Sequence, residues 1–320
     1  MLAQAQLRVT AVTILSSSLR TGHKSFDDDR RRPVITYCRG MVAYGIKTPP
    51  QHGPWADFLD VWRAADDIEL FESAWVMDHF YPLTPPLDGT HLESWTALAA
   101  LAQATKRLRL GCMVNGMHYR HPAVTANAAV TLDHISGGRF NLGLGAGWFE
   151  PESNAYGIPL GSLKERFDRF DEGLEVISSL LTNEHTDFSG NYYQLTHARC
   201  EPKPVQTRIP IVIGGRGPNR TLPAVARWAD MWDLAGADSP ATWKAASDIL
   251  DQRCAAIGRN PAEIRRSVHL MWPEDADPSA MASTAVGYAA AGVDLVIFSM
   301  RAPYRAARLE PLVTALIATI

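Results

Sequence analysis

Short apolar stretches alternate with helical patterns along most of this chain. Eight runs rich in apolar and β-branched residues have the length of strands, and glycine, proline or polar residues border them. The predicted strands are residues 42–48, 73–78, 108–114, 139–145, 209–214, 231–234, 266–271 and 293–299. Such short, nearly continuous apolar runs are typical of strands buried on both faces, as in parallel sheets.

Helices are predicted in the intervals between these strands. Trp55, Phe58 and Trp62 recur at the helical period, and Ser162 with Glu165 has the spacing of a capping box at the start of a longer helix. The predicted helices are residues 55–65, 92–104, 123–135, 163–181, 219–228, 241–257, 278–291 and 301–318. One segment, residues 186–196, breaks the alternation, because its aromatic residues flank a Ser-Gly-Asn turn typical of a β-hairpin.

Eight strand–helix units in succession predict an α/β protein with a (β/α)8 TIM barrel and an inserted β-hairpin. About 250 residues are typical of this fold, which suits a single barrel domain over residues 41–320. A doubly wound open sheet is the alternative architecture.

Residues 1–40 stand apart from this pattern. They combine a weak apolar patch, a serine run and a charged run, and we expect a disordered extension or a natural start at Met41. A signal peptide is the less favoured alternative, because the apolar patch is short and no small-residue cleavage site follows it.

Composition narrows the class of protein. The 320 residues are 46% hydrophobic with a formal net charge of −3, and this balance gives no reason to expect binding to nucleic acid or to an anionic membrane. The four cysteines, at positions 38, 112, 200 and 254, are far apart, which suits free thiols better than a disulfide framework or a zinc site. We therefore expect a cytoplasmic protein.

Glycines at the end of the predicted fourth strand and just after it predict a ligand-binding corner. Gly143, Gly145 and Gly147 alternate there, and backbone N–H groups without side-chain cover can approach a phosphate or a flat ring. A turn with tight packing is the structural alternative. Residues 81–91 and 146–161 also follow strands, are rich in proline and glycine, and are predicted as irregular loops that wall a pocket.

Two other strand ends carry candidate chemistry. Asp78 and His79 end the second strand, where a histidine can exchange protons near neutral pH, although it can also pack under a loop, held by Asp78. Asn115 follows the third strand and offers amide groups to the edge of a ring. His118 and His121 do not predict a metal site, because no carboxylate accompanies them at a ligand spacing.

A second glycine-rich corner follows the fifth strand. Gly214, Gly215 and Arg216 precede a predicted helix start with Asn219 as its cap candidate and Thr221 just after it. Glycines, a helix N-terminus and arginines together favour an anion site. Two such corners suggest a long anionic cofactor across the barrel mouth.

These segments resemble the bacterial luciferase-like monooxygenase superfamily. The resemblance covers nearly all of residues 41–320 and is carried by AYGIKT, WVMDHFYP, LRLGCMVNGMHYRHP, ISGGRFNLGLGAGWFEPE, ERFDRFDEGLEVI and PIVIGGRGPNRTL. The DHF and GAGW signatures look most like the branch that uses the deazaflavin coenzyme F420, and FMN is the alternative cofactor.

The resemblance implies positions for the cofactor and the reaction. It implies a cis peptide bond at Met113–Val114 under the cofactor ring, and Asp78 with His79 beside the reactive edge, His79 handling the proton. Sugar-phosphate dehydrogenases of the superfamily carry a catalytic glutamate where this chain has Trp148, which argues against that reaction. The implied cofactor-binding residues are Met113, Val114, Asn115, Gly145, Ala146, Gly147, Trp148, Gly214, Gly215, Arg216 and Thr221.

The sequence thus predicts an F420-dependent oxidoreductase that transfers a hydride to or from a small organic substrate. Two alternatives stay open: an FMN-dependent monooxygenase supplied by a separate reductase, and a non-catalytic flavin-binding relative. The resemblance also implies a homodimer.

Overall fold

The computed structural model describes residues 42–319. The expectations for residues 1–40, a disordered extension or a later natural start, lie outside this described part. Within it, no helix combines the length and the apolar character needed to cross a membrane.

Every predicted strand is present, and together they close into a barrel. Its wall runs in the order β1, β2, β3, β5, β8, β9, β10 and β11, and β11 pairs with β1 in parallel, from Ala43 with Leu295 to Lys47 with Ser299. The strands are β1 Ala43–Lys47, β2 Phe71–Val76, β3 Arg109–Cys112, β5 Phe140–Gly145, β8 Ile211–Gly214, β9 Met231–Ala235, β10 Arg265–Trp272 and β11 Leu295–Met300. This closure confirms the (β/α)8 barrel and rules out the open sheet.

The third barrel strand is interrupted at the Met113–Val114 bond, which is cis. The strand resumes as β4, Asn115–Gly116, and both β3 and β4 pair with β5. The cis bond that the family resemblance implied is therefore present, at the carboxyl end of this strand.

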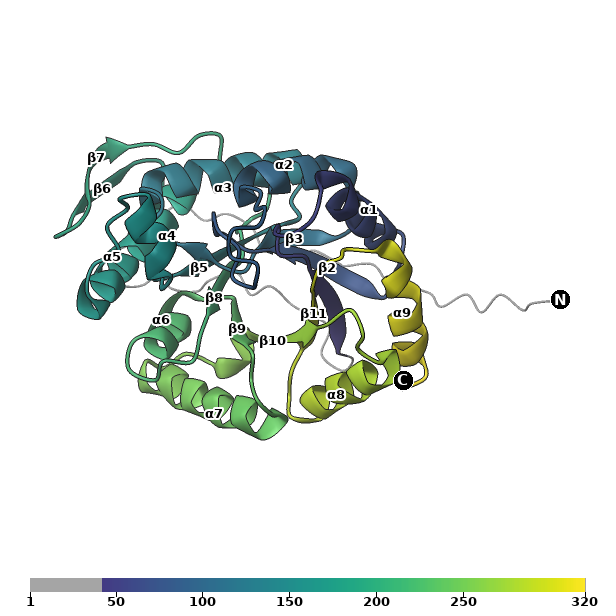
Figure 1. Cartoon of the computed structure of the whole chain (residues 1–320). Helices are drawn as coiled ribbons and strands as arrows, with labels where there is room; N and C mark the ends of the chain where they lie inside the picture. The colour runs from purple at the N-terminus through teal and green to yellow at the C-terminus, as the bar shows by residue number, and fades with distance from the viewer. Residues whose placement is uncertain (1–41, 320) are drawn as a thin grey trace. The chain divides into compact units, whose positions relative to one another are not determined.

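Helices surround the barrel, as Figure 1 shows. They are α1 Trp55–Asp66, α2 Ser94–Ala104, α3 Pro122–Ser136, α5 Leu163–Thr182, α6 Thr221–Trp228, α7 Pro240–Ala256, α8 Pro278–Ala290 and α9 Leu309–Ile317. Their buried faces and the strands form one large apolar core that includes Trp62, Phe140, Leu174 and Phe298. The predicted capping box is confirmed, because Ser162 and Glu165 bond to each other's backbone.

One helix was missed. Residues 146–161 were predicted to be irregular, yet they contain the short helix α4, Glu150–Ala155. It lacks a side-chain N-cap and is only six residues long, so its sequence carries little helical signal. Tertiary hydrogen bonds to Glu152 hold it in place instead.

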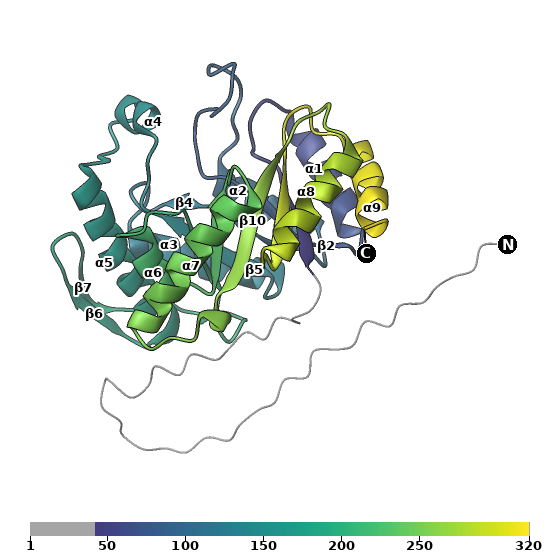
Figure 2. The same ribbon diagram turned by 90° about the horizontal axis from the view of Figure 1, so that it is seen from below.

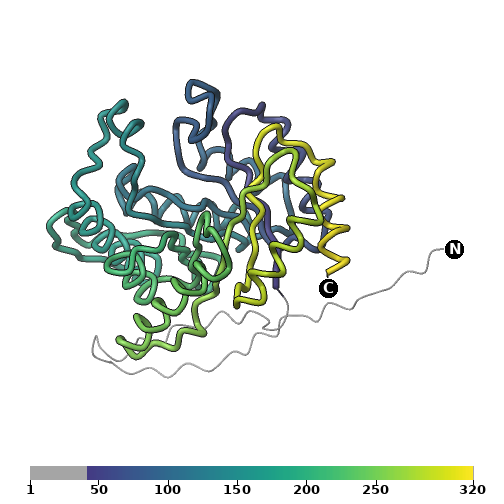
Figure 3. Tube along the Cα trace, turned by 60° about the horizontal axis from the view of Figure 1, so that its bottom comes forward, coloured from purple at the N-terminus to yellow at the C-terminus, as the bar shows by residue number. Residues whose placement is uncertain are grey.

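The predicted β-hairpin is confirmed as β6 Thr186–Ser189 and β7 Gln194–Ala198. Its strands are antiparallel and form a separate two-stranded sheet beside α5 (Figure 3). The Glu172 carboxylate of α5 accepts hydrogen bonds from the backbone N–H groups of Asn191, Tyr192 and Tyr193. The hairpin turn is therefore anchored to the barrel's outer layer.

Two long segments rise from the same end of the barrel. Figure 2 shows the loop after β2 and the segment with α4 projecting together. Both follow the carboxyl ends of strands, where barrel enzymes build their sites.

Candidate active site

A cavity of about 450 Å³ lies at the carboxyl ends of the barrel strands. Its lining brings together residues from β1 to β10 that are far apart in the sequence. The sequence-predicted residues that line it are Asp78, His79, Met113, Val114, Asn115, Gly145, Ala146, Gly147, Trp148, Gly214, Gly215 and Thr221. Arg216 is exposed and is not part of the lining.

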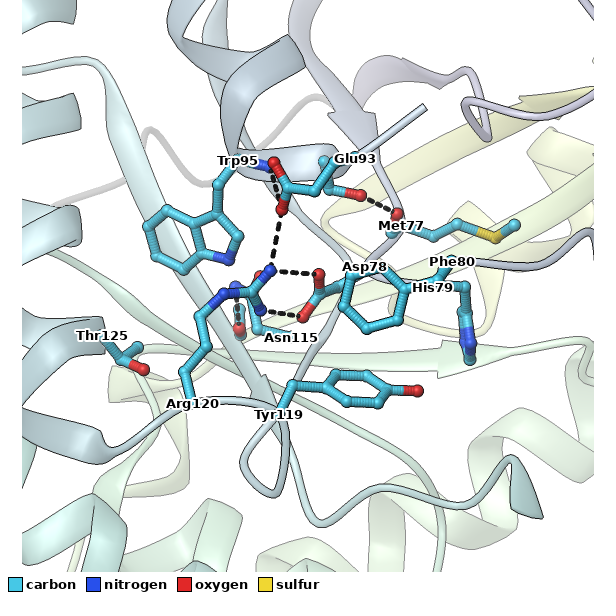
Figure 4. Close-up of polar contacts among 12 residues, drawn as sticks. Met77, Asp78, His79, Phe80, Glu93, Trp95, Asn115, Tyr119, Arg120 and Thr125 are labelled. Carbon is cyan, nitrogen blue, oxygen red and sulfur yellow. Dashed lines mark hydrogen bonds and ion pairs between the residues drawn. The ribbon is translucent and has the colours of Figure 1, made fainter. Parts of the chain in front are cut away.

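Asp78 is held by Arg120, not by His79. The two Arg120 nitrogens bind the two carboxylate oxygens at 2.7 and 3.1 Å, and the guanidinium also binds Glu93 at 2.8 Å (Figure 4). Asp78 is only 1% exposed, so burial raises the pKa of its carboxyl while the Arg120 charge opposes that rise. Arg120, in the loop before α3, thus ties the end of β2 to the start of α2.

His79 is oriented by a buried glutamate. Its Nδ1 lies 2.6 Å from Oε1 of Glu152, whose side chain is fully buried. The other carboxylate oxygen accepts the backbone N–H groups of Phe80, at 2.8 Å, and Tyr81, at 3.2 Å. The Tyr119 hydroxyl also donates to Oε1.

These contacts keep Glu152 ionised and select one tautomer of His79. Burial opposes ionisation of Glu152, but the hydrogen bonds from His79, Tyr119 and Phe80 outweigh it and lower its pKa to about 2. A carboxylate only accepts hydrogen bonds, so the Nδ1 of His79 carries the hydrogen. Nε2 is then the polar ring atom left for the cavity.

Glu152, Arg120 and Glu93 were not predicted as site residues. Glu152 lies 73 positions beyond His79 and sits in a helix that the sequence did not reveal. Its one sequence signal is a carboxylate in the loop directly after the glycine corner. Only the folded loops show that it supports His79.

The glycines of β5 are required by packing as well as by access. A Cβ on Gly143 would lie 1.9 Å from the carbonyl oxygen of Cys112, and one on Gly145 would lie 2.8 Å from a methyl of Val114. Gly147 has a φ of 89°, and a Cβ there would meet the ring of His118. The first two glycines therefore let β5 approach the Met113–Val114 bond closely.

Asn115 supplies the best test of whether a flavin-type ring fits. Its Nδ2 donates to the carbonyl of Gly143 at 2.7 Å, and its side chain is 2% exposed on the cavity wall. Its Oδ1 is buried and has no hydrogen-bond partner among the described residues. A buried acceptor costs free energy unless a donor reaches it, and the pyrimidine N–H of a flavin or deazaflavin ring is such a donor.

The second glycine corner has less positive charge than the sequence implied. The predicted cap Asn219 does not cap α6, because the helix begins at Thr221 and no side chain caps it. Arg220 is engaged with Asp168 at 2.8 Å and with Asp171 at 2.9 Å. The cavity is reached here by Gly214, Gly215 and Thr221 at the helix N-terminus, which can still bind an anion through backbone N–H groups.

The two loop histidines have separate structural roles. His118 lies 3.2 Å from the hydroxyl of Ser153, and His121 is the N-cap of α3 and accepts the N–H of Ala123. Within residues 42–319, no three histidine, cysteine, aspartate or glutamate side chains are grouped so that they could hold a metal ion.

Known proteins resemble this chain in sequence. The family model for luciferase-like monooxygenases matches residues 40–316. An F420-dependent glucose-6-phosphate dehydrogenase of Amycolatopsis mediterranei is 34% identical over 183 residues, which are 56% of this chain and 53% of the relative. The chain spans about half the length of the first curated relatives that it matches.

Solved structures share the fold at lower identity. An F420-dependent secondary alcohol dehydrogenase bound to an F420–acetone adduct has a TM-score of 0.73 at 18% identity, covering 81% of this chain and 93% of that one. A monooxygenase of Streptomyces bottropensis has a TM-score of 0.71 at 19% identity, covering 86% and 97%. The chain described here belongs to the luciferase-like monooxygenase family.

Proposed function

We propose that this protein is an oxidoreductase that transfers a hydride between coenzyme F420 and a small organic substrate. The observation that carries the proposal is His79, which lines the cavity and whose Nδ1 is held by buried Glu152, so that Nε2 is the ring nitrogen left for a ligand. The cis Met113–Val114 bond and the unpaired Oδ1 of Asn115 line the same cavity and would support and orient the ring. When bound, the cofactor would supply the hydride chemistry.

The chain's own residues would manage position and protons. Nε2 of His79 would give a proton to the substrate oxygen or take one from it, while Glu152 keeps the imidazole oriented. Gly214, Gly215 and the N-terminus of α6 would hold the anionic tail. Trp148 and Phe149 contact the His79 ring edge-on, at centroid distances of 5.8 and 5.7 Å, and would limit water around it.

The proposal of F420 as the cofactor rests on the relatives. Trp148 is the residue that argues against a sugar-phosphate substrate. Glu152 does not replace the glutamate missing at position 148, because it is fully buried and its oxygens already accept four hydrogen bonds. A carboxylate committed in this way orients His79 and is not offered to a substrate.

Cofactor titration tests the proposal. We expect the purified protein to quench F420 fluorescence with a lower Kd than it shows for FMN. Preference for FMN would shift the assignment to a monooxygenase supplied by a reductase, and binding of neither cofactor would refute the proposed function.

A His79→Ala variant tests the role of the imidazole. We expect F420 affinity to stay within about three-fold of wild type, while kcat falls by at least about 100-fold, a usual size for loss of a general acid or base. Unchanged kcat would remove the proton-transfer assignment.

A further inference from the structure

A second group of buried polar side chains lines the same cavity. Lys47 ends β1, Asp233 lies on β9 and His269 on β10, and all three belong to the lining. Their exposed fractions are 6%, 1% and 8%. The function proposed above uses none of them, although three titratable groups this deeply buried are costly unless they interact.

Lys47 has hydrogen-bonding capacity left over. Its Nζ donates to the carbonyl oxygen of Met113 at 3.1 Å, the carbonyl of the cis bond itself. An ammonium carries three hydrogens, and within residues 42–319 Nζ makes this one hydrogen bond. Burial lowers the pKa of Lys47, while the negative charge of Asp233 opposes that change. Lys47 therefore lines the cavity as a donor that lacks acceptors.

Both carboxylate oxygens of Asp233 bind neighbouring side chains. Its Oδ1 accepts the hydroxyl of Ser267 at 2.8 Å, and its Oδ2 lies 2.8 Å from Nδ1 of His269. Burial favours the protonated acid, but the interactions with His269 and Ser267 outweigh it, so the pKa of Asp233 lies below its ordinary value. Asp233 thus positions the imidazole, and each of its two oxygens already has one partner.

His269 is left with one acceptor atom. The Asp233 carboxylate requires a hydrogen on Nδ1, as Glu152 does for His79. Burial and the nearby charge of Lys47 lower the pKa of His269, so its ring is neutral at pH 7. Nε2 then carries a lone pair.

The charge balance defines the ligand. One ammonium and one carboxylate cancel, so a charged ligand group would leave a buried net charge. The atoms not yet satisfied are donors on Lys47 and an acceptor on His269. Their complement is an uncharged group with an acceptor oxygen and a hydrogen to donate, such as a hydroxyl or a carbonyl next to N–H.

We propose that Lys47, Asp233 and His269 form a polar subsite for an uncharged hydroxyl or amide-type carbonyl of the molecule that lies on the Met113–Val114 bond. Lys47 and His269 contact this group, and Asp233 positions His269. The proposal rests on the proposed function and deepens it. The group belongs either to the part of the pyrimidine edge of the cofactor ring that Asn115 does not bind or to an alcohol substrate, since both present the same chemistry.

The test compares Lys47→Met and His269→Phe with wild type and with Lys244→Met, an exposed lysine on α7 that controls for loss of charge. The first measurement is the Kd for F420 and for lumiflavin, a flavin that has the same pyrimidine edge but no phosphate tail. The second is F420 reduction by 2-propanol and cyclohexanol in a single turnover. Thermal unfolding checks that each variant folds, and Lys47→Gln replaces Lys47→Met if the latter does not.

About ten-fold weaker binding of both F420 and lumiflavin in the two subsite variants would support the proposal and assign the oxygen to the ring. Unchanged ring binding with about ten-fold slower reaction of the alcohols would support it and assign the oxygen to the substrate. Folded variants that match wild type both in cofactor binding and in the reaction with the alcohols would overturn it. Wild-type protein that binds no cofactor would refute the proposed function together with this subsite, whereas unchanged variants beside a binding wild type refute the subsite alone.

Discussion

A single carboxylate decides which nitrogen of His79 meets the cavity. Glu152 accepts hydrogen bonds from the His79 ring, from two backbone N–H groups in the loop after β2 and from the Tyr119 hydroxyl. It therefore links α4 to the loop after β2 and orients the candidate proton carrier at the same time. A residue with both tasks should change stability and turnover together when it is replaced.

We expect Glu152→Gln to lower the free energy of unfolding by about 2 kcal/mol at pH 7, since charge-assisted hydrogen bonds become weaker and one amide hydrogen faces a donor. The matched control is Glu150→Gln on the same helix, whose side chain is 66% exposed and lies 3.6 Å from Arg166. This control should change stability by less than about 0.5 kcal/mol. Urea unfolding measures both values.

The same pair predicts a pH dependence. The pKa of Glu152 is about 2 in the folded protein against an ordinary value of 4.5, so its carboxylate stabilises the fold fully above pH 4.5. That contribution is lost as the pH falls through about 2. The stability gap between wild type and Glu152→Gln should therefore be constant from pH 7 to pH 5 and shrink below pH 4.5. A gap that does not narrow in acid would contradict this account.

At the scale of elements, β5 closely approaches the third barrel strand where the Met113–Val114 bond lines the cavity. Gly143 allows this approach, because a side chain would collide with the backbone of Cys112, directly before the cis bond. Helix α8 offers the opposite case in Gly287, where a Cβ would find its nearest atom, in Pro240, at 3.5 Å.

Gly143→Ala should destabilise the protein by about 4 kcal/mol or more, or prevent folding, because backbone atoms cannot move aside as a flexible side chain can. Gly287→Ala should instead stabilise it by about 0.5–1 kcal/mol, since alanine restricts the unfolded chain in a helix interior. Soluble yield and thermal unfolding report both effects. Equal melting temperatures for wild type and Gly143→Ala would show that the strands have more room than the structure gives them.

At the scale of the whole barrel, a structural ion pair and the candidate active site lie at opposite ends. Arg265 at the start of β10 forms a two-point ion pair with Glu72 near the start of β2, with one contact at 2.8 Å. The cavity, by contrast, lies where the strands finish. This separation is general for (β/α)8 barrels.

Glu72→Ala should therefore cost about 2 kcal/mol of stability, because it removes a two-point ion pair with the buried Arg265 side chain. F420 affinity should remain at the wild-type value. Glu274→Ala, which removes an exposed ion pair with Arg305, is the control and should change stability by less than about 0.5 kcal/mol. A loss of cofactor affinity in folded Glu72→Ala would mean that the two ends of the barrel are coupled.

Local patterns were sufficient for the architecture. Apolar runs bounded by glycine and proline located all eight barrel strands, because a strand buried on both faces must be apolar throughout. The capping box at Ser162 and the hairpin were also local, since their hydrogen bonds join residues close in sequence. Asp78, His79 and the two glycine corners could be assigned to the cavity because they lie at strand ends.

The partners of these residues were decided only by the tertiary structure. Glu152 beneath His79, Arg120 beside Asp78 and Lys47 near Asp233 are joined across 42 to 186 positions of the sequence, where no periodicity relates them. Helix α4 likewise depends on hydrogen bonds between Glu152 and the loop after β2, which its own sequence does not predict. Apolar burial repeats along the chain and can be read locally, whereas a hydrogen bond between distant loops exists only after the barrel has closed.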